Sequence, residues 1–271
     1  MSEARSFIPS FTIGVEGVAL WSPFLPGWER AQRILRGDES APTAPAPRPV
    51  PQVLPPNERR RASETVALAI DAARSACSAA DRDPASLPCV FGSMYGDLAI
   101  TDYLCATLAA DPKLLSPTKF HNSVHNAPAG YWTIAVGSMR PYTALCAGEQ
   151  SFAVTLFEAI VQAHGGSEPV LMAAYDLDAR GALASVAPSR LQVANALVLA
   201  ANSDRAIVRW RVSLQPARLE AASRAQPRNE ALVAGNAMAS CLPLFEALAQ
   251  GGACRLVLPM NPSLSLVLET A

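Results

Sequence analysis

The sequence lacks the features that mark membrane proteins and nucleic-acid-binding proteins. It contains no run of about 18 apolar residues, so no helix is expected to span a membrane. The 22 basic and 23 acidic residues leave a formal net charge of −1, which offers no electrostatic attraction to nucleic acid or to an anionic membrane. Residues 1–10 do not show the charged-then-apolar order of a signal peptide, so a cytoplasmic protein is expected.

Motifs for metals and cofactors are also missing. No Walker motif and no GxGxxG motif is present, which excludes the common nucleotide-binding loops, and no cofactor is expected. The six cysteines form no CxxC pair and have no histidine at ligand spacing, so no metal site is expected. Most of them are predicted to be reduced, small residues of the core. They are Cys77, Cys89, Cys105, Cys146, Cys241 and Cys254.

What is present is an alternation of strand-like and helix-like segments. This alternation predicts an α/β fold with a mixed or largely parallel sheet that helices cover. Strands are predicted in residues 11–20, 88–92, 142–147, 168–176, 194–201, 207–214, 254–260 and 263–270. Helices are predicted in residues 27–38, 57–80, 99–112, 126–137, 149–166 and 230–252, the last interrupted by Pro243.

A proline-rich segment separates the first two predicted helices. Seven prolines fall between residues 41 and 56, which excludes a helix or a central strand there. We interpret residues 41–57 as an extended surface loop that wraps the domain. The alternative is a proline-rich ligand for another protein.

Two stretches of the sequence resemble the N-terminal half of a β-ketoacyl synthase, a condensing enzyme with the thiolase fold. They are "LSPTKFHNSVHNAPAGYW" and the strand–turn–helix "TALCAGEQSF". "VEGVALWSPF" with the helix after it, and "VFGSMYGD", are similar to the family's first strand and helix and its second strand. The chain is most similar to truncated ketosynthase-like proteins that act as chain-length-factor partners in aryl polyene synthesis.

This resemblance implies a fold and a domain organisation. It covers roughly residues 10–205, and it implies a thiolase-like (ketosynthase-like) half-fold for residues 1–205, with a mixed sheet covered by helices. The C-terminal half of the family is truncated. Residues 206–271 are then expected to form a short helix-and-strand remnant that replaces it.

The resemblance also implies a mechanism that this chain departs from. A ketosynthase loads an acyl group on an elbow cysteine and uses two histidines from its second half for decarboxylative condensation. Here the only histidines are His121, His125 and His164, so none follows residue 164. We expect a packing or interface role for His121 and His125, with a catalytic role as the alternative, and a helix-end or surface position for His164.

The elbow itself is altered. Counted along the family's spacing, the nucleophile's position falls on Glu149, or on Gln150 if one residue is inserted. Neither side chain can form a thioester. Cys146 lies three residues too early, and it is predicted to be a buried, small packing residue. No catalytic residue is therefore expected in this chain alone.

The chain lacks both the elbow nucleophile and the histidine pair of the second half, which predicts a partner protein rather than a free enzyme. Ketosynthases pair the edges of their central sheets, and each subunit helps to close the acyl tunnel of the other, so the resemblance implies a heterodimer with a full-length β-ketoacyl synthase. For Tyr131 and Trp132 the alternative to an interface role is burial in the core. For Asn122 and Asn126 the first role expected is structural, namely to hold the loop backbone by hydrogen bonds. The residues assigned to the interface or tunnel are Phe120, His121, Asn122, His125, Asn126, Tyr131 and Trp132.

Two other functions stay open at this point. Cys146 could act as a nucleophile with His125 or His121 as base, which would give an acyltransferase or a thioesterase. Alternatively, the basic cluster Arg59–Arg61 could receive an acidic acyl carrier protein, which would make the chain a docking module.

Overall fold

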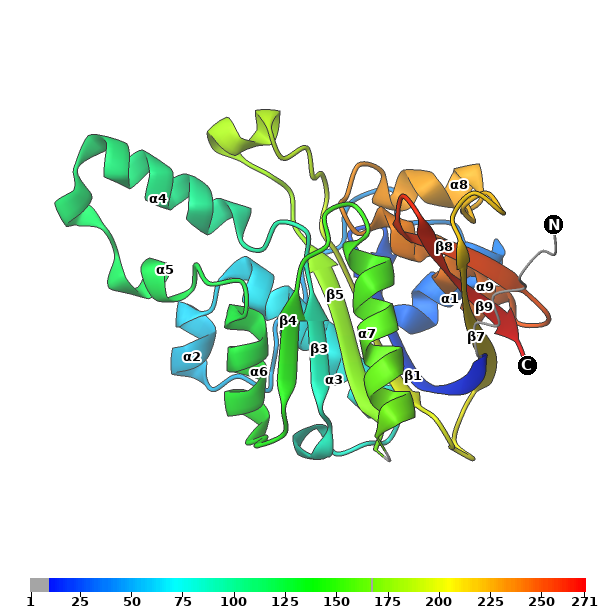
Figure 1. Cartoon of the computed structure of the whole chain (residues 1–271). Coiled ribbons are helices and arrows are strands. Elements are labelled where there is room, and N and C mark those ends of the chain that lie inside the picture. Colours follow the sequence, from blue (N-terminus) through cyan, green and yellow to red (C-terminus); the bar gives the residue numbers. More distant parts are fainter. Residues whose placement is uncertain (1–9, 167) are drawn as a thin grey trace, which may run out of the picture.

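The structure is a computed structural model that describes residues 10–166 and 168–271. The expectation that no signal peptide is present falls on residues 1–10, and residues 1–9 lie outside the described part. Within it, the strands form one mixed sheet in the order β4-β3-β5-β6-β1-β7-β9-β8, with β2 paired to β1 (Figure 1). Strand β3 runs parallel to β4 and β5, and the other paired neighbours are antiparallel.

The strands lie close to where the alternation pattern predicts them. The long central strands are apolar at nearly every position, as strands covered on both faces must be. Their bounds are β1 (Phe11–Ser22), β2 (Leu25–Pro26), β3 (Cys89–Gly92), β4 (Tyr142–Leu145), β5 (Val170–Asp176), β6 (Val193–Ala200), β7 (Val208–Pro216), β8 (Arg255–Asn261) and β9 (Leu264–Thr270).

Helices cover both faces of the sheet. Helices α3 and α6 pack on one face, and α1, α7 and α9 pack on the other (Figure 1). The bounds are α1 (Trp28–Arg36), α2 (Pro56–Arg61), α3 (Glu64–Ala79), α4 (Leu98–Ala110), α5 (Pro117–His121), α6 (Ala127–Val136), α7 (Ser151–Gly165), α8 (Pro227–Glu230) and α9 (Leu242–Gln250).

Two of the predicted helices are wrong in extent. The helix expected over 57–80 is divided into α2 and α3, because Ala62 is extended and the Ser63 hydroxyl accepts a hydrogen bond from the Val66 amide to begin a new helix. The helix expected over 230–252 is regular only in α9. Pro243 lies in the first turn of α9, where its missing N–H costs nothing, so it begins this helix and does not interrupt it.

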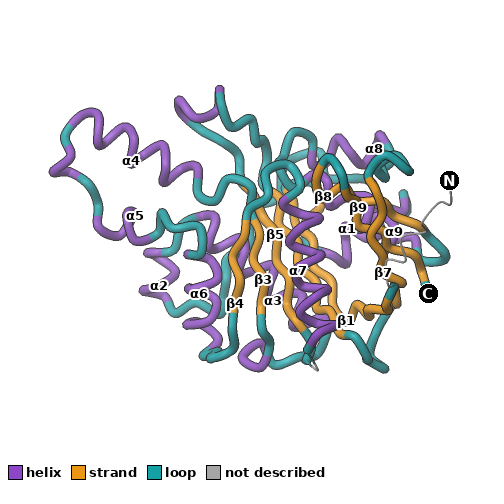
Figure 2. Tube along the Cα trace, in the orientation of Figure 1, coloured by secondary structure: helices purple, strands orange, loops and turns teal. Residues whose placement is uncertain are grey.

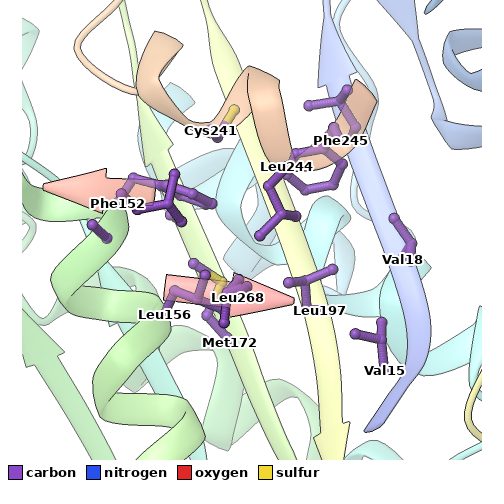
Figure 3. Close-up of a cluster of buried hydrophobic side chains, with 14 of the residues drawn as sticks. Val15, Val18, Phe152, Leu156, Met172, Leu197, Cys241, Leu244, Phe245 and Leu268 are labelled. Carbon is purple, nitrogen blue, oxygen red and sulfur yellow. The ribbon is translucent and has the colours of Figure 1, made fainter. Parts of the chain in front are cut away.

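The last strands curl round to close one face of the sheet. Although β8 is at the far end of the strand order, it contacts α7, which packs on β5 and β6. Figure 3 shows Leu268 of β9 beside Leu156 of α7 and beside Met172 and Leu197 of the central strands. Residues 206–271 therefore supply apolar cover for α7.

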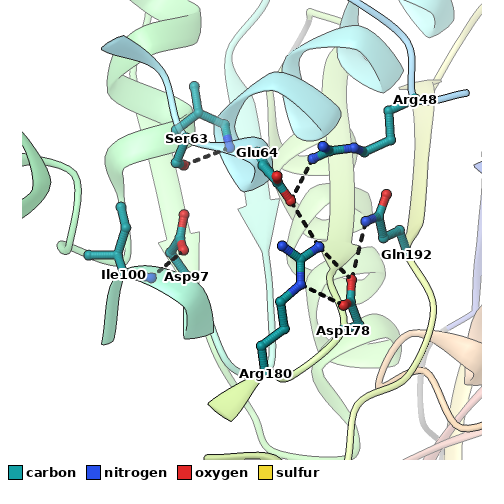
Figure 4. A network of polar contacts seen from close by, with 9 residues as sticks. Arg48, Ser63, Glu64, Asp97, Ile100, Asp178, Arg180 and Gln192 are labelled. Atoms are coloured by element: carbon teal, nitrogen blue, oxygen red, sulfur yellow. Dashed lines mark hydrogen bonds and ion pairs between the residues drawn. The ribbon is translucent and has the colours of Figure 1, made fainter. Parts of the chain in front are cut away.

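The proline-rich segment wraps the domain without helix or strand between Arg36 and Pro56 (Figure 2). Arg48 pairs with Glu64 at 2.6 Å, and Glu64 also binds Arg180, which in turn binds Asp178 (Figure 4). Pro51 and Leu54 are buried. This loop is thus tied to the start of α3 and to the connection between β5 and β6.

Helices α4 and α5 form an arm that stands off the sheet beside β4 (Figure 1, Figure 2). We use "the arm" for residues 98–121, from the first residue of α4 to the last residue of α5. Only Leu98 and Ile100 of α4 are buried, although the helix is largely apolar. An apolar helix left this exposed has too little cover from its own chain.

Candidate functional site: an altered elbow beside an open sheet edge

Three parallel strands end at the same edge of the sheet, and the candidate site lies there. Ser93 follows β3, Cys146 follows β4, and Asp176 is the last residue of β5. The carboxyl ends of parallel strands are the usual place for a site in an α/β sheet. The sequence reasoning missed Ser93 and Asp176, although a polar residue directly after a buried strand is a signal that could have found them.

The turn between β4 and α7 keeps the shape of a nucleophile elbow. Gly148 has φ of 58°, a left-handed conformation that favours glycine. The buried Ser151 hydroxyl accepts from the Ala147 amide at 3.0 Å and donates to the Gly148 carbonyl at 2.7 Å. Ser151 therefore holds both sides of the turn, and it is a third residue that the sequence reasoning missed.

The residues at the predicted nucleophile position have no thiol and cannot form a thioester. Glu149 is exposed in the turn, and Gln150 is half-buried at the N-cap of α7. Cys146 is exposed, so the prediction that it is a buried packing residue is wrong. The reason is its place just beyond β4, on the open edge of the sheet. Its thiol donates to the Met94 carbonyl at 3.1 Å, which uses the protonated form of the sulfur.

Asp176 holds the turn that leads from β3 to the arm. Its carboxylate accepts hydrogen bonds from the Ser93 hydroxyl at 2.8 Å and from the amides of Met94 at 2.7 Å and Tyr95 at 3.1 Å. Burial raises the pKa of Asp176 to about 6, although these hydrogen bonds lower it. The Asn236 amide donates to the Asp176 carbonyl at 3.0 Å, which joins the C-terminal quarter to this corner.

The histidines do not form a base for Cys146. His125 bonds through Nε2 to the Ser93 carbonyl at 3.0 Å, so that nitrogen carries the proton. The exposed His121 lies edge-on to Tyr131, and His164 stacks on Phe11 with ring centroids 3.9 Å apart. No thiol–imidazole hydrogen bond occurs in residues 10–166 and 168–271, and the exposed position predicted for His164 is confirmed.

Beside the elbow, β4 leaves one side of its backbone open. Among the described strands β4 pairs only with β3. Cys89 and Ser93 donate to the carbonyls of Pro141 and Leu145, so these two carbonyls face β3. Because backbone groups alternate along a strand, the peptide groups of Tyr142 and Ala144 point away from the sheet. They form a short, unpaired edge.

An apolar groove of about 590 Å³ lies behind this edge, between α2, α5 and α6. Four of the residues predicted for the interface or tunnel line it. Of these, Phe120 has 64% of its surface exposed, and Tyr131 is half-buried, with burial raising the pKa of its phenol. The four are Phe120, His121, Asn126 and Tyr131, and Leu54, Val124, Gly130 and Ile134 also line the groove.

Exposed apolar side chains gather on the same side of the molecule. Of the twelve large apolar residues exposed in the described part of the chain, seven fall between residues 108 and 142. Ile134 is 80% exposed and Met139 is 96% exposed. The seven are Leu108, Leu114, Phe120, Val124, Ile134, Met139 and Tyr142. Exposed large apolar side chains in this number are typical of a surface that another molecule covers.

Two of the remaining predicted interface residues, Asn122 and Trp132, turn inward. Trp132 has no exposed surface and packs in the core with α3, which favours the core alternative for this residue. Asn122 is buried and donates to the Arg61 carbonyl at 2.8 Å, and Asn126 donates to the Tyr142 hydroxyl at 3.0 Å. Asn122 thus fixes the backbone at the C-terminal end of α2, whereas Asn126 fixes a side chain of the edge strand.

The sequence also led to expectations about the cysteines, a metal site and membrane-spanning helices. Cys77, Cys89 and Cys241 are buried as predicted, and burial raises the pKa of each thiol to about 12. The expectation that most of the six cysteines lie in the core is wrong, because Cys105 and Cys146 are exposed and Cys254 is half-buried. In residues 10–166 and 168–271, no group of three or more ligand side chains is placed to hold a metal ion. None of the helices described is long and apolar enough to cross a membrane.

The ordered β4-β3-β5-β6-β1 sheet, with α7 beginning at an elbow, defines a condensing-enzyme type of fold. A family profile described as β-ketoacyl synthase, N-terminal domain, matches residues 27–253. The chain therefore belongs to this family. A search of curated proteins finds no match.

Solved structures share the fold over nearly the whole chain. The ketosynthase ApeO in complex with its chain length factor ApeC from Xenorhabdus doucetiae matches with a TM-score of 0.73 and 21% identity, over 96% of this chain and 99% of that chain. The ishigamide ketosynthase/chain length factor matches with a TM-score of 0.68 and 13% identity, over 96% and 99%.

A third match includes a carrier protein. It is the AntDE:AntF complex, a type II acyl carrier protein with its ketosynthase bound to the hexaketide. Its TM-score is 0.71 at 12% identity, over 97% of this chain and 99% of that chain. These likenesses and the family confirm the predicted fold class, a thiolase-like α/β fold whose mixed sheet is covered by helices.

Proposed function

We propose that this chain is a non-catalytic, chain-length-factor-like subunit that pairs with a full-length β-ketoacyl synthase. The observation that carries the proposal is the elbow between β4 and α7. Its turn is held by Ser151, and the spacing expected from the family puts Glu149 or Gln150 at the position of the nucleophile. A thioester requires a thiol, so the scaffold is retained without the group that would make it an enzyme.

The proposed contact is the open side of the sheet. The outward peptide groups of Tyr142 and Ala144 can pair with the edge strand of a ketosynthase sheet. The exposed apolar side chains of α6 and the arm then bury themselves against the same partner. An unpaired edge together with an apolar surface is costly in water, and pairing removes both costs.

The groove beside the edge is the proposed wall of the partner's acyl tunnel. It is lined mainly by apolar groups, and Phe120, Tyr131 and Ile134 supply its bulk. A rigid apolar wall rejects a further two-carbon unit by steric overlap, so the side chains here would set the product length. We propose polyketide or fatty-acid-type synthesis of the aryl polyene kind as the setting.

An acyl carrier protein is the second proposed partner. Arg60 and Arg61 are exposed at the end of α2, next to Leu54 and Glu58 of the groove wall. Carrier proteins are acidic, and exposed arginines beside a tunnel wall would attract them through charge. Arg59 is less available, because it is half-buried and donates to the Leu54 carbonyl at 2.9 Å.

The test is co-expression with a full-length ketosynthase from the same gene neighbourhood. Each protein is also expressed alone, and size-exclusion chromatography with mass measurement gives the stoichiometry. We expect a one-to-one complex, with condensing activity only when both chains are present. Two separate species, or turnover by this chain alone, would overturn the proposal.

The Cys146-dependent acyltransferase or thioesterase is the competing function, and thiol labelling separates the two. Cys146 and Cys105 are both exposed, so iodoacetamide can reach both. A nucleophilic thiol labels much faster at neutral pH than an ordinary one. We expect similar rates for C146S and C105S, each retaining one of these thiols. Faster labelling that only C146S abolishes would support the enzyme.

A further inference from the structure

A small cavity lies where the arm joins the sheet. Its volume is about 10 Å³, and it is lined by the start of α3, the turn before α4, the loop after α5, the first turn of α6 and the end of β5. The arm leaves the domain at Asp97, the N-cap of α4, and returns at Asn122, the C-cap of α5. Both of these residues line the cavity, together with Tyr175 of β5.

Each of these three side chains has one buried polar atom that no other protein group in the described part of the chain reaches. The atoms are Asp97 Oδ2, Asn122 Oδ1 and the Tyr175 hydroxyl. Tyr175 is 1% exposed and Asn122 is 3% exposed. A buried polar atom without a hydrogen bond is costly, and three of them around one cavity point to a common ligand.

The other polar atoms of the same side chains are fully used. Asp97 Oδ1 accepts from the Ile100 amide at 2.9 Å, which caps α4. Asn122 Nδ2 donates to the Arg61 carbonyl at 2.8 Å. These bonds fix both side chains, so the remaining oxygens cannot turn to other partners without breaking a helix cap or a loop contact.

We propose that the cavity binds one ordered water molecule that joins both ends of the arm to the central sheet. The water donates its two hydrogens to Asp97 Oδ2 and Asn122 Oδ1 and accepts the hydroxyl proton of Tyr175. This gives each of the three unpartnered atoms one hydrogen bond of the correct polarity. A space of about 10–15 Å³ with two to four polar partners is what a buried water needs.

A metal ion fits this cavity less well than water. Three oxygens line it, whereas hard cations take about six or more oxygen ligands. The tyrosine hydroxyl would also have to turn its proton away from the cavity. Water needs no further ligands, and it accepts the proton of the tyrosine hydroxyl directly.

The bound water has a structural consequence for the arm. The arm's two ends meet at a single point, and the water fixes that point to Tyr175, whose ring packs edge-on against Phe91 of β3. The water then adds to the direct contact in which the Ala182 amide donates to Asp102 of α4 at 3.2 Å, and both help to set the orientation of the arm relative to the sheet. This inference does not depend on the proposed pairing, because it concerns the chain by itself.

The direct test is a crystal structure of the full chain at a resolution that shows water. We expect one water oxygen about 2.6–3.2 Å from all three atoms. An empty cavity, direct bonds among the three side chains, or a metal ion at this place would each overturn the proposal.

A second test uses hydrogen exchange, measured by mass spectrometry on the folded chain. Y175F removes only the donor to the water, and Y142F removes a hydroxyl contact outside the cavity as a matched control. Amides in residues 98–121 should exchange roughly fivefold faster in Y175F and at the native rate in Y142F, because one net hydrogen bond is lost from the arm's attachment. Equal exchange in the native chain and Y175F would contradict the role assigned to the water.

Discussion

The two edges of the sheet differ in how far the chain itself covers them. At one edge, β8 curls back until it contacts α7, and its apolar side chains enter the core with those of β9. At the other, β4 stops after four residues and exposes the peptide groups of Tyr142 and Ala144 beside an apolar groove. The first edge is covered by the chain's own residues, whereas the second has no cover from the described chain.

Residues at the covered edge therefore stabilise the fold, whereas residues at the open edge are available to a partner. Substitutions on the covered side should lower the free energy of unfolding and leave the pairing surface intact. Substitutions on the open side should do the reverse, because those residues contribute little to the monomer. The predictions below use this contrast, beginning with the largest expected effect.

On the covered side, the largest effect is expected from Leu268→Ala. Leu268 is completely buried among Leu156, Met172 and Leu197. Removal of its side chain leaves a cavity, and the free energy of unfolding should fall by about 2–5 kcal/mol in urea denaturation. If the loss were below about 0.5 kcal/mol, β9 would not be part of the core in solution.

Between the two regions, Asp176 should make stability depend on pH. Its pKa is about 6 in the folded chain and near 3.8 when unfolded. Stability is therefore fully present below about pH 4 and is lost as the pH rises through 6, by about 3 kcal/mol in total. D176N should abolish this fall between pH 4 and 7, measured as the slope of the unfolding free energy against pH. An unchanged slope would contradict the assignment.

Glu16 provides the internal comparison for that measurement. Burial raises the pKa of Glu16, but the hydrogen bonds from Arg82 and Ser203 and the nearby positive charges together lower it by more. The pKa in the folded chain therefore lies below that in the unfolded chain. Its contribution is present above about pH 4.5 and is lost as the pH falls further. E16Q should flatten only the acid limb of the pH profile.

On the open side, Ala144→Pro should prevent pairing. Its amide points away from β3, so proline removes an outward donor and leaves the bonds to β3 in place. We expect affinity for the ketosynthase to fall about a hundredfold, or about 2.7 kcal/mol. Monomer stability should change little, and thermal unfolding of the isolated chain checks this. Full binding by a folded variant would exclude this edge.

A smaller effect is expected from a charge on the apolar surface of α6. Ile134→Asp places a carboxylate in the groove and should weaken binding about tenfold, while the monomer stays within about 0.5 kcal/mol of the native stability. Ile207→Asp is the matched control, because Ile207 is 64% exposed but lies away from the groove. Equal effects of both variants on binding would mean that general charge, and not this surface, matters.

The smallest change is expected in product length. A Cβ added at Gly130 meets no atom within 4 Å, and Gly130 lines the groove. Gly130→Leu should shorten the product by about one two-carbon unit in the reconstituted complex, read by mass spectrometry. Gly130→Ala should have a weaker effect. Longer products from the leucine variant would contradict the tunnel assignment.

Much of the fold was predictable, because strands buried on both faces and amphipathic helices have clear sequence patterns. The helix break at Ser63 was missed because it depends on one side-chain cap. The last helix was predicted too long because residues before α9 form turns that are held against β5 and the β5–β6 connection. Such contacts between distant residues are not visible in a local pattern. Their effect on structure appears only when the sheet is assembled.

The candidate site was predictable in part. The residues at the elbow, Glu149 and Gln150, were identified from spacing, and the groove contains four of the seven predicted interface residues. Exposure of Cys146 was not predictable, and burial of Trp132 was predicted only as an alternative, since both depend on which side of the sheet remains open. Ser151 acts through hydrogen bonds to the backbone of its own turn, which a sequence does not reveal, whereas the position of Asp176 at the end of a buried strand was a usable signal.

Hydrogen exchange at the two sheet edges tests the central claim most directly. The isolated chain and its complex with the ketosynthase are compared at the amides of Tyr142 and Ala144 and at those of β8. Pairing at the open edge predicts strong protection of Tyr142 and Ala144 in the complex and no change in β8. Protection confined to β8, with β4 exchanging as fast as in the isolated chain, would contradict the account.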